Sequence, residues 1–361
     1  MTSKIKGVRI AGVASAVPTN TISLSQTADS AGVTQEEAEK IAKMTGVRNR
    51  AVAPAGMCTS DLACAAAAKL MAELDWDPST IEVLVVVSQT HDYDAPATAC
   101  CVQERLGIPK SCAAFDMALG CSGYIYGLWV CSSLLASGSV KRALFLAGDT
   151  STWCTSPQDR GTAFLFGDAG TATALERDEN APPMSFVVGT DGTGRDYLIE
   201  PGTGYRNRIK AETIARTPGA DGVPRSPLDL HMDGSEVFAF TLRQVPPLLK
   251  DVLSLSGWGI DQMDAFVPHQ ANLFMLQHLA KRLKIPPEKL VVSLDEFGNT
   301  SSASIPLAMS HRLALRLSAG PVNLVLAGFG VGWSWGALAV QCGPMVMPEI
   351  VRLDQAVAAA S

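Results

Sequence analysis

The chain has 361 residues, of which 47% are hydrophobic and 18% are charged, and its formal net charge is −6. This length allows a large buried core, in one large domain or in two smaller ones. The negative charge argues against nucleic acid as the main partner, because phosphate binding normally requires a basic surface.

The first half of the chain alternates apolar strands with helices. The residue pattern over 7–17 predicts a strand that ends at Pro18, and Thr34 with Glu37 forms a capping box for a helix that reaches Met44. The next expected elements are a helix over 60–74, a strand over 83–87, a helix over 97–106, a strand over 113–115, a helix over 126–135 and a strand over 143–147. This alternation predicts an α/β fold of parallel sheets covered by helices.

The second half repeats the same order of elements, displaced by roughly half the chain. The repeated elements are a helix over 237–253 and strands over 265–267, 291–293 and 323–327. Glycine-rich strand pairs at 165–170 and 327–332 are expected to close the two halves, with a tight hairpin over 164–168. The order of elements therefore indicates an internal duplication of one α/β unit.

This duplication suggests where the chain divides. We expect an N-terminal half over 1–180, a C-terminal half over 181–345 and a tail over 346–361. The segment 205–229 is rich in Gly, Pro and Arg and breaks the pattern, so we predict a surface loop there.

A candidate nucleophile lies where a predicted strand meets a predicted helix. Cys121 stands at this junction among glycine and serine neighbours, which leave room for a substrate. The helix dipole and free N–H groups favour a thiolate there, so we expect a lowered pKa. The backbone amides of Cys121 and of Val331 or Gly332 are candidates for an oxyanion hole. The alternative is a buried structural cysteine beside a packing glycine.

Two further candidates lie in the second half. His269 follows Pro268 at a strand end, and Asn299 stands between Gly298 and Thr300. If the halves pack about a pseudo-twofold axis, both residues approach the cysteine of the first half. A neutral imidazole N–H and an amide N–H suit the enolate oxygen that forms when a malonyl thioester loses CO₂. The alternative for an isolated Asn after Gly is a turn residue.

Five motifs, taken in order, resemble those of a known family. They are the stretch around Cys121, Asp159 to Thr162, Val267 to Asn272, Phe297 to Ala308, and Gly330 to Gly336. Together they resemble β-ketoacyl-acyl-carrier-protein synthase III, a condensing enzyme of the thiolase fold. The resemblance implies a duplicated thiolase-like fold with five layers, α/β/α/β/α, and a homodimer. It also implies a catalytic triad of Cys121, His269 and Asn299.

The chain departs from the family pattern where typical members bind the coenzyme A nucleotide. In those members a tryptophan and an arginine precede the Thr-Gly pair that is found here at Thr45, and Lys40 and Met44 take their places. The arginine that usually follows His-Gln-Ala-Asn-Leu is Phe274. Loss of a stacking ring and two guanidinium groups should weaken recognition of the nucleotide.

Other substrate contacts follow from the same comparison of motifs. Arg160 and Asn272 match the family pattern, whereas Ala95 replaces a bulky aromatic residue that plugs the acyl pocket of housekeeping members. The small residue should admit a longer or polar acyl group. The acyl donor is then either coenzyme A, bound in another way such as through 205–229, or an acyl carrier protein.

The resemblance favours decarboxylative condensation of an acyl thioester with malonyl-carrier protein, through an acyl-cysteine intermediate, with no cofactor beyond the thioesters. One alternative is an acyltransferase of the same fold, which passes the acyl group to an alcohol or an amine. Another is a non-catalytic partner subunit of a related synthase.

The cysteines and the N-terminus bear on the compartment. The nine cysteines are odd in number and lack C-x-x-C spacing, so we expect reduced thiols without a metal site. The first residues show no signal-peptide pattern, and no apolar run approaches the roughly 18 residues that cross a membrane. We therefore expect a cytoplasmic protein with no membrane partner.

Overall fold

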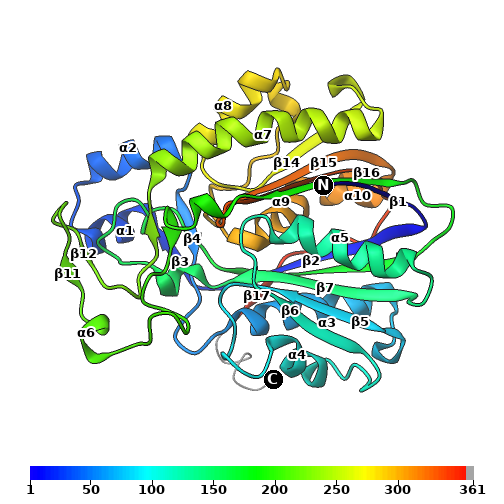
Figure 1. Cartoon of the computed structure of the whole chain (residues 1–361), viewed down its shortest axis with the longest axis horizontal. Coiled ribbons are helices and arrows are strands. Elements are labelled where there is room, and N and C mark those ends of the chain that lie inside the picture. The colour runs from blue at the N-terminus through cyan, green and yellow to red at the C-terminus, as the bar shows by residue number, and fades with distance from the viewer. Residues whose placement is uncertain (355–361) are drawn as a thin grey trace.

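The computed structural model describes residues 1–354, so 355–361 of the expected tail lie outside the described residues. Two mixed sheets form its frame (Figure 1). The six-stranded sheet has the order β17 (Val351–Leu353), β2 (Val8–Pro18), β8 (Ala169–Arg177), β7 (Arg142–Asp149), β5 (Val83–Val87) and β6 (Ala113–Met117). The five-stranded sheet has the order β1 (Thr2–Ile5), β9 (Met184–Thr190), β16 (Ser334–Cys342), β15 (Val322–Gly330) and β14 (Ala265–Pro268).

Three layers of helices alternate with the two sheets (Figure 1). They are α3 (Thr59–Leu74) and α4 (Thr98–Arg105) outside the six-stranded sheet, α5 (Gly123–Ala136) and α9 (Ser304–Arg312) between the sheets, and α7 (Gly234–Ser256) and α8 (Leu273–Leu283) outside the five-stranded sheet. The expected five-layered α/β/α/β/α fold is confirmed.

Shorter elements complete the chain. They are α1 (Leu24–Ala31), α2 (Gln35–Thr45), α6 (Ala211–Ile214), α10 (Ala314–Ala319), β3 (Thr21–Ser23), β4 (Asn49–Ala51), β10 (Leu198–Ile199), β11 (Thr217–Pro218), β12 (Pro224–Arg225) and β13 (His231–Met232). The predicted capping box of α2 is present: Thr34 Oγ1 accepts from the Glu37 amide at 3.2 Å, and Glu37 Oε2 accepts from the Thr34 amide at 2.9 Å.

Helix α5 is buried because it is apolar on every side. Its buried residues include Tyr124, Ile125 and Leu128, and a helix without a polar face has no stable position at a surface. The ring of Tyr124 stacks on Phe145 of β7 with centroids 5.4 Å apart. This packing fixes the start of α5, and with it Cys121, in the central layer.

The duplication is visible in the strand pairing. In the first half β5 pairs with β7 in parallel, and β7 pairs with β8 in antiparallel orientation. In the second half β14 pairs with β15 in parallel, and β15 pairs with β16 in antiparallel orientation. The chain ends cross between the halves, since β1 joins the five-stranded sheet and β17 joins the six-stranded sheet.

The strand expected at 291–293 is wrong. Only an isolated bridge between Phe266 and Leu290 forms there. The carboxamide of Gln270 takes the ladder positions instead, because its Nε2 donates to the Val291 carbonyl at 3.2 Å and its Oε1 accepts from the Ser293 amide at 2.7 Å. The side chain next to His269 thus replaces a strand neighbour and anchors the loop.

The tight hairpin expected over 164–168 is also wrong. This segment pairs with the chain at Asn299 from the other half: the Asn299 amide donates to the Leu165 carbonyl at 2.8 Å, and the Gly167 amide donates to the Asn299 carbonyl at 3.0 Å. A side chain at Gly167 would place its Cβ 1.8 Å from the Phe297 carbonyl oxygen. Glycine is therefore needed for close approach between the halves and not for a reverse turn.

The segment 205–229 lies on the surface, as predicted, and ion pairs hold it. Arg216 pairs with Asp229 at 2.7 Å, and Arg225 pairs with Asp159 at 2.6 Å. Two of the arginines that could have bound the phosphates of coenzyme A therefore pair with carboxylates of the chain itself.

Candidate active site

The three predicted catalytic residues line one cavity of about 70 Å³. Cys121 precedes α5, His269 follows β14, and Asn299 precedes a 3₁₀ turn over Ser301–Ala303. The other residues around the cavity are mainly apolar: Leu165, Phe166, Leu198, Met232, Gly234, Val237, Thr241, Ala271, Asn272, Met275, Phe329 and Gly330. Segments far apart in sequence thus meet around one small apolar space.

Glycines bring β15 close to the sulfur. The Cys121 side chain is 8% exposed, and a Cβ built on Gly330 would lie 2.8 Å from its Sγ atom. Gly330 also has φ +154°, which disfavours other residues. At Gly328 a Cβ would lie 2.8 Å from the Cys121 carbonyl oxygen. These two glycines explain the Gly-rich run near the end of the chain.

The expected lowering of the thiol pKa is wrong for the resting enzyme. Burial raises the pKa of the Cys121 thiol to about 11, against hydrogen bonds from the Val331 backbone and the Ser301 side chain that favour the thiolate. The desolvation penalty of the thiolate outweighs the stabilisation that was expected from the N-terminus of the following helix. At neutral pH the sulfur therefore rests as a thiol.

This protonation state predicts a pH profile. Below the thiol pKa the thiolate fraction rises tenfold per pH unit, so alkylation of Cys121 by iodoacetamide should accelerate about tenfold per unit between pH 7 and pH 9. Peptide mass mapping separates this reaction from alkylation of the exposed Cys100. A plateau below pH 8 would show a preformed thiolate and contradict the burial argument.

His269 is buried and neutral. Desolvation lowers its pKa to about 4, although a hydrogen bond with the Ser301 backbone opposes this shift. Its Nδ1 lies 2.7 Å from Ser304 Oγ, which also accepts from the Gln270 amide at 3.3 Å. With the Ser304 hydroxyl donating to Nδ1, the ring carries its proton on Nε2. The imidazole is then suited to donate a hydrogen bond at neutral pH and unsuited to act as a strong base.

The Asn299 carboxamide is held in one orientation. Its Oδ1 accepts from the Ser301 amide at 3.0 Å, and its Nδ2 donates to the Ala271 carbonyl at 3.5 Å. Its backbone also bonds the Leu165–Gly167 segment. The backbone of Asn299 forms an isolated bridge with Phe166 and not a turn, and its side chain lines the cavity, so its role as a donor stays a prediction.

The assignment of an oxyanion hole to the backbone amides of Cys121 and of Val331 or Gly332 stays a prediction. The Val331 backbone forms a hydrogen bond with the Cys121 sulfur, whereas within the described chain Gly330, and not Gly332, lines the cavity. Sequence reasoning assigned no role to Ser301 or Ser304, although both lie in the motif that carries Asn299. Their spacing, two and five residues after the asparagine, was the signal that could have identified them.

One of the five predicted substrate-binding residues lines the cavity, and the other four do not. Asn272 lines the cavity, but its Oδ1 caps α8 by accepting from the Met275 amide at 2.8 Å. Thr45 Oγ1 donates to the Ile41 carbonyl at 3.1 Å and so belongs to the end of α2. Thr45 is thus occupied in structural bonds, whereas Asn272 can still offer its Nδ2 group to the cavity while its Oδ1 caps the helix.

Two other predicted contacts lie outside the cavity, beside α2 and in α8. The Arg160 guanidinium pairs with Glu37 at 3.2 Å, and Phe274 is 49% exposed with its ring stacked on Phe238, centroids 5.6 Å apart. Ala95 lies away from the cavity, exposed in the loop between β5 and α4. Its neighbours Tyr93 and Asp94 border a separate hollow of about 530 Å³.

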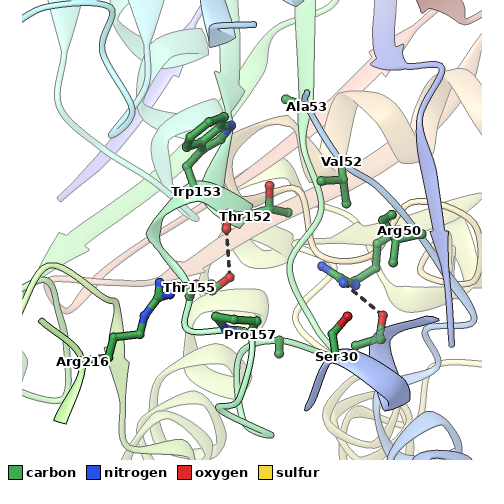
Figure 2. Close-up of a pocket in the computed structure, with 12 residues that line it drawn as sticks. Ser30, Arg50, Val52, Ala53, Thr152, Trp153, Thr155, Pro157 and Arg216 are labelled. Atoms are coloured by element: carbon green, nitrogen blue, oxygen red, sulfur yellow. Dashed lines mark hydrogen bonds between the residues drawn. The ribbon is translucent and has the colours of Figure 1, made fainter. Parts of the chain in front are cut away.

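Figure 2 shows a third hollow, of about 370 Å³, which contains none of the predicted site residues. Arg50 reaches in from one side, while Trp153 and Arg216 border the opposite side. The Arg50 guanidinium already donates to the Phe166 carbonyl at 3.1 Å and to Thr27 Oγ1 at 3.0 Å. This hollow is distinct from the cavity that holds the cysteine.

Within residues 1–354 no group of three or more His, Cys, Asp or Glu side chains is placed to hold a metal ion. None of the helices in that range combines the length and apolarity needed to span a bilayer.

The sequence and the structure match those of known proteins. Residues 115–192 match the family described as 3-oxoacyl-[acyl-carrier-protein (ACP)] synthase III, and residues 253–342 match 3-oxoacyl-[ACP] synthase III C terminal. The chain is 36% identical over 342 residues to a beta-ketoacyl-[acyl-carrier-protein] synthase III from Symbiobacterium thermophilum, covering 94% of this chain and 99% of that protein.

Solved structures give the same result. A 3-oxoacyl-(acyl-carrier protein) synthase from Burkholderia xenovorans LB400 has a TM-score of 0.92 and 40% identity, covering 98% of this chain and 99% of that one. The priming β-ketosynthase from the R1128 polyketide biosynthetic pathway has a TM-score of 0.82 and 28% identity, covering 95% and 98%. The two family regions contain all three predicted catalytic residues.

Proposed function

Because the chain belongs to the β-ketoacyl-[acyl-carrier-protein] synthase III family, we propose that it is an acyltransferase that condenses an acyl thioester with malonyl-carrier protein. The product is a 3-oxoacyl-carrier protein, and CO₂ is released. The observation that carries this proposal is the shared cavity of a cysteine, a neutral histidine and a fixed carboxamide.

In the first half-reaction the Cys121 sulfur attacks the carbonyl carbon of the acyl thioester. The oxygen becomes negatively charged, and the backbone N–H groups of Cys121 and Val331 are the proposed donors to it. The carbon–sulfur bond of the donor then breaks, and the proton of Cys121 leaves with the departing thiol. An acyl-cysteine remains.

In the second half-reaction His269 Nε2–H and Asn299 Nδ2–H donate to the thioester oxygen of the malonyl group. The carbon–carbon bond to the carboxylate breaks, and its electron pair forms the enolate as CO₂ leaves. The enolate carbon attacks the acyl carbonyl, and collapse of the adduct releases the Cys121 sulfur, which is reprotonated. Neutral donors suit this step, because the charge to be stabilised is negative.

The alternatives explain the site less well. An acyltransferase to an alcohol or amine needs a base to activate its acceptor, whereas the pKa of His269 is lowered to about 4. A non-catalytic subunit needs no nucleophile. Here Cys121 lines the cavity, and the glycine at position 330 of β15 avoids a Cβ atom that would lie 2.8 Å from the Cys121 sulfur.

We propose that the acyl donor is borne by a carrier protein. Phe274 lies in the first turn of α8, between the cavity-lining Asn272 and Met275. Met44 lies in α2, which packs on α8. Phe274 and Met44 are 49% and 60% exposed, and Arg160 is already paired with Glu37 of α2. These side chains offer apolar surface where a nucleotide needs stacking and cations. The acyl donor is then recognised through its pantetheine arm and the carrier protein. In an acyl-CoA donor the nucleotide would add little to the binding affinity.

Installing a cation in place of Phe274 should change this preference. In the unaltered protein, acyl-CoA and acyl-pantetheine should give kcat/KM values for loading of Cys121 that agree within about threefold. Phe274→Arg should raise the value for acyl-CoA about tenfold, because a new guanidinium can bind a phosphate. Leu315→Arg is the matched control, since Leu315 is 90% exposed in α10. A strong preference for acyl-CoA in the unaltered protein would contradict the assignment.

Partner surfaces are proposed on the same grounds. Strand β6 ends the six-stranded sheet with one free edge, which favours pairing with a second copy in a homodimer. Lys281, Arg282 and Lys284 lie at the end of α8, whose first turn borders the cavity, and they suit an acidic carrier protein. A cytoplasmic location fits reduced thiols and is part of the proposal.

The test is to incubate the protein with a panel of acyl thioesters and malonyl-carrier protein and to weigh protein and products by mass spectrometry. We expect an acyl adduct on Cys121 and a carrier-bound product that has gained the acyl group and lost CO₂. Ester or amide products without CO₂ release would support the acyltransferase alternative instead. Failure of Cys121 to gain any acyl mass would support the non-catalytic subunit.

A further inference from the structure

A buried carboxyl group bonds the Ser301–Ser302 turn, which follows Asn299 in the chain. Asp149 is the last residue of β7 and is 1% exposed. Burial raises the pKa of this carboxyl, against hydrogen bonds from Gln89 and Ser302 that favour its charged form. Burying a carboxyl is costly unless hydrogen bonds compensate, so its partners matter.

The two oxygens of Asp149 bond different halves of the molecule. Oδ1 accepts from the Gln89 amide at 2.7 Å and from Ser88 Oγ at 3.2 Å, both just beyond the end of β5. Oδ2 accepts from Ser302 Oγ at 2.7 Å and from the Ser302 amide at 3.1 Å. One carboxyl group therefore ties the first-half strand ends to a turn of the second half.

That turn contacts every member of the triad through Ser301. The Ser301 amide donates to Asn299 Oδ1 at 3.0 Å, and hydrogen bonding with the Ser301 backbone raises the pKa of His269 while that with its side chain lowers the pKa of Cys121. Ser301 has φ +49°, a conformation that residues with a Cβ rarely adopt. A turn of this kind needs support from outside, and the carboxyl group bonded to the next residue supplies it.

Resting on the proposed function, we propose that Asp149 is a positioning residue for the condensation step. Its carboxylate fixes the Ser301–Ser302 turn so that Asn299 and His269 direct their N–H groups to one oxygen beside Cys121. It touches no reacting atom, and its effect reaches the enolate only through the orientation of the two donors.

Asp168 provides a matched comparison within the same half. It is also buried, and it accepts from the Ala53 amide at 2.7 Å and the Thr152 amide at 3.0 Å. It has no bond to the Ser301–Ser302 turn. Loss of either carboxylate disturbs the half that carries Cys121, but of the two only Asp149 bonds the Ser301–Ser302 turn directly.

The test compares three variants of the full chain. In Asp149→Asn the new NH₂ group faces an N–H of Gln89 or Ser302 and cannot accept from it. We expect kcat for condensation to fall about tenfold to a hundredfold, with the KM for malonyl-carrier protein and the rate of acyl loading within about threefold of the unaltered protein. Ser302→Ala, which keeps the backbone bond, should show a smaller loss of the same kind. Asp168→Asn should leave the ratio of condensation to loading unchanged.

Two results would overturn the inference. One is an Asp149→Asn variant that condenses as fast as the unaltered protein, and the other is equal loss of loading and condensation in Asp149→Asn and Asp168→Asn, as a general structural role requires. An unaltered protein that loads no acyl group would contradict the proposed function itself, and this inference with it.

Discussion

Replacement of Cys121 by alanine is expected to abolish acyl loading and to reduce condensation by at least about a thousandfold, because among the described residues no other thiol lines the cavity. The fold should survive, since the change removes one atom from a wall where Gly330 already makes the tightest approach. Decarboxylation of malonyl-carrier protein should continue, because His269 and Asn299 remain in place. Intact-protein mass gives the loading, and trapped CO₂ gives the decarboxylation.

The other cysteines provide the internal control for this experiment. Cys131 and Cys342 are buried away from the cavity, and their replacement by alanine should leave loading unchanged. A Cys121→Ala protein that still gains an acyl mass or forms 3-oxoacyl product at an undiminished rate would show that the nucleophile lies elsewhere.

Removal of either neutral donor should separate the two half-reactions. In His269→Ala and Asn299→Ala, condensation should fall about a hundredfold to a thousandfold, on the order of 3 kcal/mol of transition-state stabilisation, because the enolate loses one of two preorganised donors. Acyl loading should remain close to that of the unaltered protein, since the proposed oxyanion hole of that step uses backbone N–H groups. Single-turnover assays of loading and of condensation measure the two effects separately.

A matched histidine tests the specificity of the effect. His278 lies exposed on α8, with its ring in edge contact with Phe238 outside the cavity, so His278→Ala should change neither half-reaction. Condensation should also stay nearly constant between pH 6 and pH 8 on account of His269, because its lowered pKa keeps it neutral throughout that range. Loss of loading in His269→Ala would make the histidine a base for the first step and contradict its assignment as a donor.

The sequence predicted the elements and the triad because both leave local signals. Continuous apolar strands such as Val83–Val87 and the capping box at Thr34 are fixed by residues close in the chain. Cys121, His269 and Asn299 could be proposed as a triad because each stands next to glycine or proline at an element end, and the structure places all three around one cavity. The repeat of element order then suggested that they meet.

The errors arose where distant contacts decide the structure. Residues 291–293 form no strand, because the side chain of Gln270 bonds their backbone. Residues 164–168 form no hairpin, because their backbone pairs with that of Asn299. The raised pKa of Cys121 depends on burial by segments that are remote in sequence. Periodicity and spacing contain no information on which residues exclude water from a given atom.

The account depends most on one event: the acyl group on Cys121 forms a carbon–carbon bond with a carbanion made in the same cavity. The direct measurement is a single turnover of isolated acyl-enzyme with malonyl-carrier protein, followed by mass spectrometry of both proteins. We predict that the adduct leaves Cys121 as the carrier gains the acyl group and loses CO₂, in equal amounts. Loss of the adduct as free acid or as an ester or amide, with the malonyl group intact, would contradict the account.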